Sequence, residues 1–284
     1  MLHGVATPGK DMELYRLLRN DLPHNLAPQH FRLARDIVTR YVFPHLRPDL
    51  GPKLAAGDPA EAAAMVGFHG QQKDGVDDIE DAVLRDVYRT AFSSTASDVI
   101  IDCGAFIGIG AAAVGPSLHE GRLIALEADA RNVALLERNT RENGLERVDV
   151  LHRAIWCEHG RVLDLATGEA QANTLRHDVF DGGNRQPVET ASIDGLVSEH
   201  GLEKVDMLSF TVNGAEVEAL DGAKDTLAEF RPRIRLAGWY RRDGHSVADL
   251  CRPRLEAAGY HVHVGRKLGV LALPAEQVPE RSRS

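Results

Sequence analysis

The spacing of apolar residues along this chain of 284 residues changes near residue 95. Before that point, three stretches carry apolar side chains three or four positions apart, which is the spacing of one helix face. They are residues 11–22, 29–46 and 79–92. Beyond residue 95, short apolar runs alternate with longer amphipathic stretches. Such alternation predicts an α/β fold whose sheet is mostly parallel.

The alternating part predicts strands and helices that follow one another in order. Strands are expected at residues 98–102, 123–127, 148–155, 205–210 and 233–239, with a short pair at 161–166 and 186–191 and a terminal hairpin over 260–274. Helices are expected near 111–118 and over 130–144, 214–230 and 246–259. We therefore divide the chain into an N-terminal helical region (1–95), a sheet domain (96–274) and a polar tail (275–284).

The segment 98–110, DVIIDCGAFIGIG, is the most informative part of the chain. A buried strand runs into a glycine turn and then into a helix. Gly104 and Gly108 let a ligand approach the backbone, and the helix start behind them offers free N–H groups. Glu127 ends the next strand, 25 residues after Asp102, which suits a carboxylate that holds ribose hydroxyls. The segment therefore predicts a cofactor at the carboxyl ends of the first two strands.

Composition and charge narrow the classes of protein. The net charge of −9 leaves no broad basic face for phosphate backbones, so we expect no nucleic-acid partner. The three cysteines lie far apart and match neither a zinc site nor a disulfide framework, which favours a reducing, cytoplasmic location. The N-terminus is too polar for a signal peptide. No apolar run reaches the ~18 residues that a spanning helix needs, so no membrane partner is expected.

Several segments carry a family resemblance: VIIDCGAFIG, ALEADARNVALLERNTRENGL, RAIW, VETASIDGLV and VDMLSFTVNGAEVEALDGA. Their order and spacing, over about residues 80–273, resemble the FkbM family of S-adenosylmethionine-dependent methyltransferases. The resemblance implies a class I methyltransferase fold, which is Rossmann-like and has seven strands with the last one antiparallel. It also implies S-adenosylmethionine as cofactor and O-methylation of a sugar, polyketide or similar small molecule.

One segment departs from that family. The family commonly has a lysine, an aspartate and a glutamate in the stretch matching LSFTVNGAE, where this chain has Ser209, Thr211 and Asn213. Without these carboxylates the segment offers no ligand set for a hard cation, and the 13 histidines show no metal spacing. We therefore expect no metal. Because of this departure, the family's catalytic roles do not carry over directly to these three positions, as expected for a divergent branch of the family.

The resemblance and the residue chemistry together suggest how the cofactor is held. Asp102 is expected to receive the cofactor's ammonium group, and backbone N–H groups its carboxylate. Glu127 is expected to accept hydrogen bonds from two ribose hydroxyls. Gly104→Val is expected to block the ligand while leaving the fold largely intact. The glycines also fit plain strand–helix packing, and Asn132 also fits a surface position. The expected cofactor-binding residues are Asp102, Gly104, Ala105, Phe106, Ile107, Gly108, Glu127, Ala128, Asn132, Ala154 and Ile155.

The transferred methyl group is expected at the ends of the fourth and fifth main strands. Thr211, Asn213 and Glu216 follow the fourth strand and are the candidate catalytic residues. For Glu216 a structural interpretation is favoured, because a carboxylate in the first turn of a helix interacts well with the helix dipole. Trp239 and Tyr240 follow the fifth strand and fit either one wall of an acceptor pocket or core packing.

Other side chains are weaker candidates. His177 and His245 lie in loops and are candidate bases, and Tyr88 is a candidate cover for the cofactor. His261 and His263 alternate on a strand and are expected to face solvent together. The N-terminal helical region is expected to cover the acceptor site or to form a homodimer contact, and the sequence does not choose between the two.

The sequence therefore favours an S-adenosylmethionine-dependent methyltransferase that acts at oxygen on a small molecule or glycan. The first alternative is an NAD-dependent oxidoreductase, although Gly104, Gly108 and Gly110 do not fit the G-x-G-x-x-G spacing. The second is a non-catalytic binding or scaffold protein that kept the fold. A nucleic-acid methyltransferase is the third, and the turn after the fourth strand lacks the proline that many of those enzymes carry.

Overall fold

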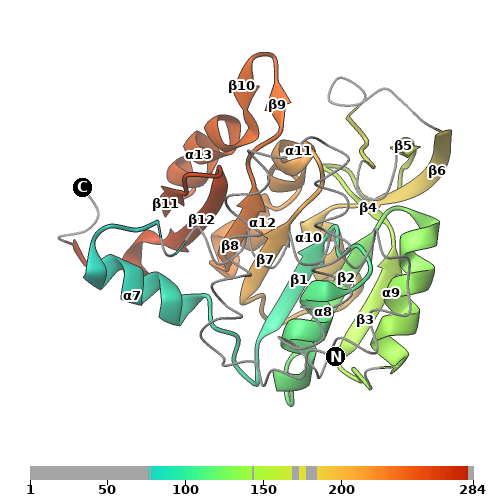
Figure 1. The fold of residues 1–284 in the computed structure, drawn as a ribbon, viewed down its shortest axis with the longest axis horizontal. Coiled ribbons are helices and arrows are strands. Elements are labelled where there is room, and N and C mark those ends of the chain that lie inside the picture. The colour runs from blue at the N-terminus through green and yellow to red at the C-terminus, as the bar shows by residue number, and fades with distance from the viewer. Residues whose placement is uncertain (1–75, 77, 143, 168–172, 177–183, 281–284) are drawn as a thin grey trace, which may run out of the picture. The chain divides into compact units, whose positions relative to one another are not determined.

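The computed structural model describes residues 76, 78–142, 144–167, 173–176 and 184–280 (Figure 1). The chain forms two compact units, 1–70 and 71–284, and every described residue belongs to the second. The helices expected over 11–22 and 29–46 lie outside the described residues. The helix expected over 79–92 is present as α7 (Ala82–Ala91).

A seven-stranded sheet forms the centre of the second unit, with the strand order β11-β12-β8-β7-β1-β2-β3. The strands are β1 (Val99–Cys103), β2 (Arg122–Glu127), β3 (Val148–His152), β7 (Met207–Phe210), β8 (Arg233–Ala237), β11 (Tyr260–Val264) and β12 (Gly269–Pro274). Neighbouring strands are parallel except at β12, which runs antiparallel to both β8 and β11. This confirms the class I methyltransferase sheet, with its antiparallel last strand.

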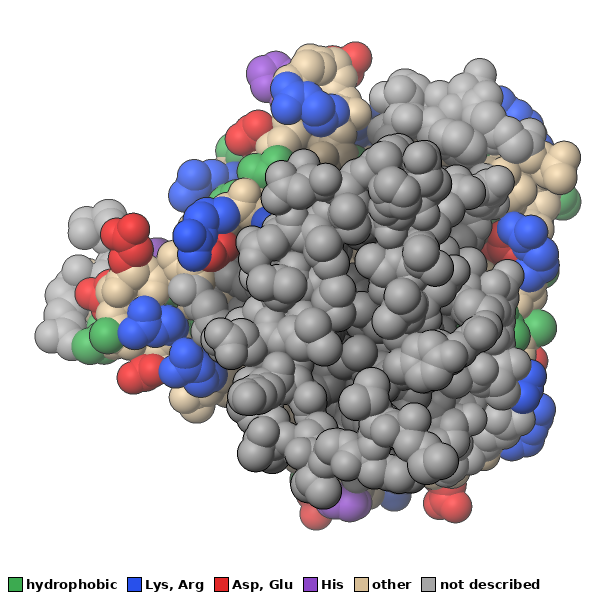
Figure 2. Space-filling model, viewed as in Figure 1, with side chains coloured by type: hydrophobic (Ala, Val, Ile, Leu, Met, Phe, Trp, Pro, Cys, Tyr) green, Lys and Arg blue, Asp and Glu red, His purple; other side chains and the backbone are tan. Residues whose placement is uncertain are grey.

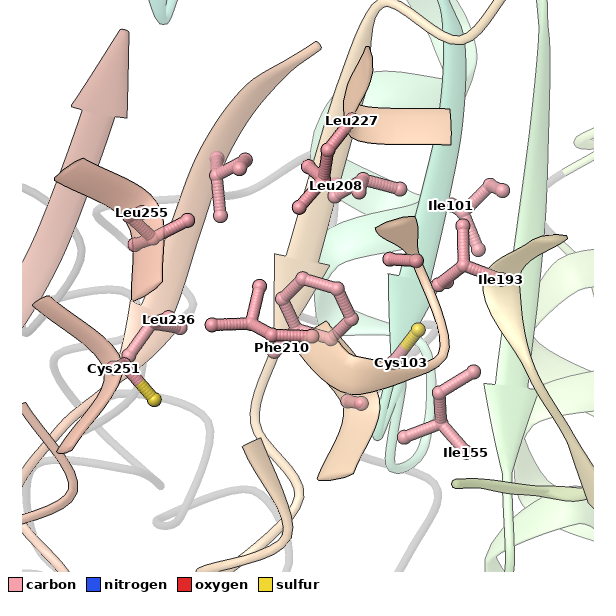
Figure 3. Close-up of a cluster of buried hydrophobic side chains, with 14 of the residues drawn as sticks. Ile101, Cys103, Ile155, Ile193, Leu208, Phe210, Leu227, Leu236, Cys251 and Leu255 are labelled. Carbon is pink, nitrogen blue, oxygen red and sulfur yellow. The ribbon is translucent and has the colours of Figure 1, made fainter. Parts of the chain in front are cut away.

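Helices cover both faces of the sheet. Successive residues of a strand face opposite sides, and the strands carry apolar side chains on both sides that the helices bury. One face packs against α7, α8 (Ile109–Val114) and α9 (Ala130–Glu142), and the other against α10 (Ile193–Glu199), α11 (Glu216–Asp221), α12 (Lys224–Glu229) and α13 (Val247–Ala257). The larger core lies on the second face, where Ile101 and Phe210 of the sheet belong to one buried cluster with Ile193, Leu227 and Leu255 of the helices (Figure 3). These two layers fix the carboxyl ends of the strands at one edge.

The strand expected over 148–155 is interrupted. It ends at His152, and Ala154–Ile155 form a separate strand, β4, which pairs in parallel with β6 (Asn184–Ala191) instead of continuing along β2. A tight turn separates the two pieces, since the N–H of Arg153 donates to the carbonyl of Leu151 at 3.0 Å. The prediction of one continuous strand was therefore wrong at its last two residues.

The helix expected over 214–230 is also interrupted, and forms α11 and α12 with a break at Gly222 and Ala223. The carbonyl of Gly222 accepts a hydrogen bond from the N–H of Asp194 at 3.0 Å. A Cβ atom at residue 222 would lie 2.6 Å from the carbonyl oxygen of Trp156. The break thus lets the chain around Asp194 and Trp156 approach the helix backbone.

The terminal hairpin expected over 260–274 is present as β11 and β12, and two further hairpins lie outside the seven-stranded sheet. The expected one joins β5 (Val162–Thr167) to β6 in antiparallel pairing. The second, β9 (Arg241–Arg242) with β10 (His245–Ser246), was not expected. Its turn residues Asp243 and Gly244 have φ of 49° and 83°, as in the hairpin turns for which Asp-Gly is a strong sequence signal. Figure 2 shows basic and histidine side chains gathered where Figure 1 places this hairpin.

Candidate active site

The turn between β1 and α8 is pinned by backbone contacts to the strands on both sides. The N–H groups of Gly104 and Ala105 both donate to the carbonyl of Leu126, at 2.9 and 2.8 Å. Gly104 has a φ of 81°, and a Cβ atom there would clash with the carbonyl oxygen of Thr211. The expectation that Gly104→Val leaves the fold intact was therefore wrong, because any side chain at this position pushes the ends of β1 and β7 apart.

Glu127 ends β2 as a buried carboxylate that joins two turns. Its Oε2 accepts a hydrogen bond from the N–H of Phe106 at 2.9 Å, and its Oε1 accepts one from the N–H of Asp129 at 2.9 Å. The amide of Asn132 lies 3.4 Å from Oε1, and Asn132 is 6% exposed, so the surface alternative for Asn132 was wrong. Burial raises the pKa of Glu127 above its ordinary value, although the hydrogen bonds to its carboxylate oppose that shift.

The glycine turn uses most of its own N–H groups internally. Besides those of Gly104 and Ala105, the N–H of Phe106 goes to Glu127 and that of Gly108 to the carbonyl of Ala105 at 2.9 Å. Backbone donors for a ligand are therefore expected from Ile107 or from the first turn of α8, the helix start at which the sequence predicted them.

Asp102 lies on the face of the sheet covered by α8. It is buried, and a Cβ atom at Gly110 would lie 2.8 Å from its Oδ2. In the sheet register Asp102 pairs with Ser209 of β7, and Ser209 pairs with Arg235 of β8. The Nε of Arg235 donates to the Oγ of Ser209 at 3.1 Å. Burial lowers the pKa of Arg235, and the charge of Asp102 opposes that shift.

Three of the expected cofactor-binding residues, Ala128, Ala154 and Ile155, separate into two groups. Ala154 is buried in a small cluster with Leu165 and Val188, and Ala128 packs against that cluster. The side chain of Ile155 belongs instead to the large core between the sheet and α10–α13. Ala128 and Ala154 thus lie on the same side of the strand ends, and Ile155 supports them from the core.

The turn between β7 and α11 holds the three candidate catalytic residues. The N–H of Thr211 donates to the carbonyl of Cys103 at 2.9 Å. Asn213 has a φ of 54°. Both oxygens of Glu216 accept backbone N–H groups of this turn, from Val212 at 3.0 Å and from Gly214 at 2.9 Å. Glu216 is fully buried, and burial raises its pKa to about 7. This geometry favours the structural interpretation of Glu216.

A segment that the sequence did not single out crosses this edge of the sheet. We call residues 173–176, which follow β5, the strap. The amide of Asn173 donates to Oδ2 of Asp129 at 3.0 Å, and its carbonyl accepts from the amide of Asn213 at 2.7 Å. The hydroxyl of Thr174 donates to the carbonyl of Asn213 at 2.9 Å. The strap therefore connects the residues that follow β2 to those that follow β7.

The chain after β8 joins the same network. The hydroxyl of Tyr240 donates to Oδ1 of Asn213 at 2.7 Å, and burial raises the pKa of Tyr240 to about 12. The ring of Trp239 lies 6.3 Å from that of Tyr240. Glu218 of α11 binds Arg242 of β9 at 2.8 Å and Arg176 of the strap at 3.1 Å.

The remaining candidates lie elsewhere. The Tyr88 hydroxyl is 2.8 Å from Nδ1 of His261, and its ring packs edge-on against His261 and His263. Tyr88 therefore packs on an edge strand away from the glycine turn, so its expected role as a cover for the cofactor was wrong. The two histidines share one side of β11, as expected, but that side packs against Tyr88 of α7 and is half-buried. His245 is exposed on β10, and His177 lies outside the described residues.

The described residues lack two further features, a metal-binding cluster and a membrane-spanning helix. No group of three histidine, cysteine or acidic side chains there is arranged to hold a metal ion. None of the helices seen there is both long and apolar enough to cross a membrane.

Comparison with known proteins then decides the family. A family model described as the methyltransferase FkbM domain matches residues 102–262, more than half of the chain. The chain belongs to the FkbM methyltransferase family. The matched range begins at Asp102 and contains the glycine turn, Glu127, the strap and the β7–α11 turn.

The 2-O-methyltransferase NoeI of Sinorhizobium fredii (strain NBRC 101917 / NGR234) is 29% identical over an alignment of 150 residues, and the match covers 47% of this chain and 60% of that protein. The chain thus spans less than two thirds of that curated relative. Among solved structures, methyltransferase FkbM from Methylobacillus flagellatus KT has a TM-score of 0.45 at 19% identity, covering 84% of this chain and 60% of that one. A SAM-dependent methyltransferase from Aquifex aeolicus has a TM-score of 0.36 at 14% identity, covering 72% of this chain and 97% of that one.

The last strand residues of β7 and the turn that follows carry uncharged side chains at Ser209, Thr211 and Asn213. The guanidinium of Arg235 on the neighbouring strand donates to the hydroxyl of Ser209. The side chain of Asn213 is bound by Asn173 and Tyr240. A hydrogen-bonded network of uncharged groups therefore occupies this turn.

Proposed function

We propose that this FkbM-family protein transfers a methyl group from S-adenosylmethionine to a hydroxyl oxygen of a small molecule or glycan. The observation that carries the proposal is the buried carboxylate of Glu127 at the end of β2, bound to the β1–α8 turn through the N–H of Phe106 at 2.9 Å. Asp102 lies near the end of the adjacent parallel strand. Ligands of open parallel sheets bind at these strand ends.

The residues at this edge fit the chemistry of that cofactor. Asp102 is positioned to receive an ammonium group, and Glu127 to accept hydrogen bonds from two ribose hydroxyls. Ala128 and Ala154 provide an apolar side for the adenine ring. When bound, the cofactor supplies an activated methyl group. The protein orients it, through Phe106 and Asn132 acting on Glu127.

Positioning accounts for most of the catalysis in this proposal. Asn213 does not titrate, and Tyr240, whose pKa burial raises to about 12, stays protonated. Glu216 has a pKa of about 7, but both of its oxygens hold the 212–214 turn. We infer that the acceptor hydroxyl is aligned beside Thr211 and Asn213 and that its proton passes to water.

Two observations support the acceptor class. The curated relative is named as a 2-O-methyltransferase, which supports a hydroxyl acceptor. The net charge of −9 supports an acceptor other than a nucleic acid, because proteins that bind phosphate backbones usually present a basic face.

Calorimetric titration tests the cofactor assignment. Wild-type protein is expected to bind S-adenosylmethionine and its demethylated product, and Glu127→Ala to weaken that binding by about 1.5–3 kcal/mol, or roughly 10- to 150-fold. Glu137→Ala, at an exposed position on α9, is the matched control and is expected to change affinity less than twofold. Binding of NADH with no heat from either methionine ligand would overturn the proposal.

A non-catalytic binding protein is the second candidate, and the uncharged Thr211 and Asn213 favour it. It predicts the same cofactor affinity but no labelled-methyl transfer to any hydroxyl acceptor. Methyl transfer to any one acceptor, lowered together with cofactor binding in Glu127→Ala, excludes this candidate.

A further inference from the structure

We propose that the strap, residues 173–176, forms a wall of the acceptor site, and that Thr174 and Asn213 are the positioning residues that hold it there. The proposal rests on the methyltransferase function proposed above, because it assigns a role to the second half of the same edge. It gives Asn213 the role of an anchor for the strap, where the sequence suggested a catalytic group.

The strap passes the carboxyl end of β1. Asn173 binds Asp129, which follows β2, and also Asn213, which follows β7. In the sheet β1 lies between β2 and β7. A segment that touches the ends of both outer strands therefore crosses the end of the strand between them, where Asp102 and Gly104 lie.

The attachment on the β2 side is a charged hydrogen bond to a buried carboxylate. Asp129 is fully buried, and Arg131 binds both of its oxygens, at 2.8 and 2.9 Å. Burial raises the pKa of Asp129, but the hydrogen bonds from Arg131 outweigh that effect and lower it overall. The amide of Asn173 therefore donates to an ionised oxygen, and such bonds are about twice as strong as neutral ones.

The attachment on the β7 side uses both the side chain and the backbone of Asn213. Its amide nitrogen donates to the carbonyl of Asn173 at 2.7 Å, and its own carbonyl accepts from the hydroxyl of Thr174 at 2.9 Å. Its Oδ1 accepts from Tyr240 at 2.7 Å. Asn213 is thus held from both sides, and its left-handed backbone, with φ of 54°, is one that asparagine tolerates well.

Two further contacts hold the ends of the strap. The backbone of Thr174 pairs with that of Ala166 on β5 through two hydrogen bonds of 3.0 Å. Arg176 binds Glu218, which also binds Arg242 beyond β8. Removal of a single attachment is therefore expected to loosen the strap without unfolding the sheet.

A pair of variants at Thr174 tests the proposal. Thr174→Val keeps the shape of this buried side chain but removes the hydroxyl that donates to Asn213 and accepts from the N–H of Arg176. Thr174→Ser restores the hydroxyl. We expect amide hydrogen exchange in the strap to rise at least tenfold in Thr174→Val and in Asn213→Ala, and to return toward the wild-type rate in Thr174→Ser. Asn184→Ala, exposed at the start of β6, is the control and is expected to leave the strap unchanged.

The functional readout separates positioning from plain structure. With methyl glycosides as acceptor probes and a labelled methyl donor, Thr174→Val is expected to lower kcat/KM for the acceptor at least tenfold. Affinity for the demethylated cofactor product should stay within twofold, and Thr174→Ser should recover turnover. Unchanged strap exchange in Thr174→Val and Asn213→Ala would overturn the proposal, as would equal losses of turnover and product affinity. A wild-type protein that does not bind the product would refute the proposed function, while the exchange result would still decide whether these residues hold the strap.

Discussion

The two halves of the carboxyl edge are built in different ways. On the β1–β2 side, Asp102, Gly104 and Glu127 lie within one short stretch of chain, and the contacts among their turns join residues about 20 apart, such as Phe106 and Glu127. On the β7–β8 side, the strap reaches Asp129 and Asn213 over 44 and 40 residues. The first half is a local motif, whereas the second exists only once the chain has folded.

In the proposed function, the first half of the edge binds the cofactor and the second half binds the acceptor. The first half supplies a buried carboxylate at a strand end, an arrangement that suits one cofactor and many acceptors. The second half carries amides and hydroxyls that bind one another, those of Asn173, Thr174, Asn213 and Tyr240. Substitutions in the second half are therefore expected to affect the acceptor more than the cofactor.

The largest effect is expected from a substitution at Gly104, where the two halves of the edge meet. In Gly104→Ala the new Cβ clashes with the carbonyl of Thr211, and the backbone has a φ of 81°. We expect a loss of about 2–4 kcal/mol in the free energy of unfolding, from the clash and the left-handed backbone together. Urea denaturation measures it. Gly201→Ala is the control, with a φ of 56° and no atom within 4 Å, and should cost only ~1 kcal/mol. Equal losses in the two variants would show that the contact with Thr211 does not matter.

A smaller effect is expected from the ionisation of Glu216 beneath the acceptor half. Its pKa is raised from 4.5 to about 7 in the folded protein, so between these pH values the folded state binds more protons than the unfolded state. Stability should therefore fall as pH rises through that window. Glu216→Gln removes this titration, although it also weakens one of the two bonds to the 212–214 turn. The difference in unfolding free energy between wild type and variant should shrink from pH 5 to pH 8. A constant difference would mean that Glu216 titrates normally.

Tyr240→Phe tests the part of the network that follows β8. The variant removes the hydrogen bond to Oδ1 of Asn213 and keeps the ring, so a loss of about 1 kcal/mol is expected. It should appear as a roughly fivefold fall in acceptor turnover, with affinity for the cofactor product within twofold of wild type. A larger fall in product affinity than in turnover would place Tyr240 on the cofactor side.

Removal of divalent metal ions is expected to have no effect on methyl transfer. The described residues contain no cluster of metal ligands, and the β7–α11 turn carries Thr211 and Asn213 instead of carboxylates. Methyl transfer should therefore proceed at the same rate with EDTA present. Activity that disappears with EDTA and returns with magnesium would contradict this expectation.

The sequence predicted the first half of the edge because its signals are local. An apolar run ending in Asp102, a glycine turn and Glu127 at the end of the next strand can each be read from a few neighbouring residues. Even there, the sequence did not reveal that Gly104 is required by the approach of Thr211, which comes from a strand more than 100 residues later.

The second half was largely hidden for the same physical reason. Asn173 and Thr174 lie in an ordinary polar loop, and nothing nearby indicates that Asp129 and Asn213 will meet them. The split of the helix after β7 depends on the backbone near Trp156 packing against Gly222. The β9–β10 hairpin is an exception, because the Asp-Gly pair at 243–244 was a local signal that could have predicted it.

A crystal structure of the protein with the demethylated product of S-adenosylmethionine would show where the cofactor lies at this edge of the sheet. We expect the ribose hydroxyls within hydrogen-bonding distance of the Glu127 carboxylate, the ammonium group near Asp102, and the sulfur pointing toward Thr211 and Asn213 beneath the strap. A ligand bound elsewhere, with Glu127 contacting only Phe106, Asp129 and Asn132, would contradict this placement of the cofactor.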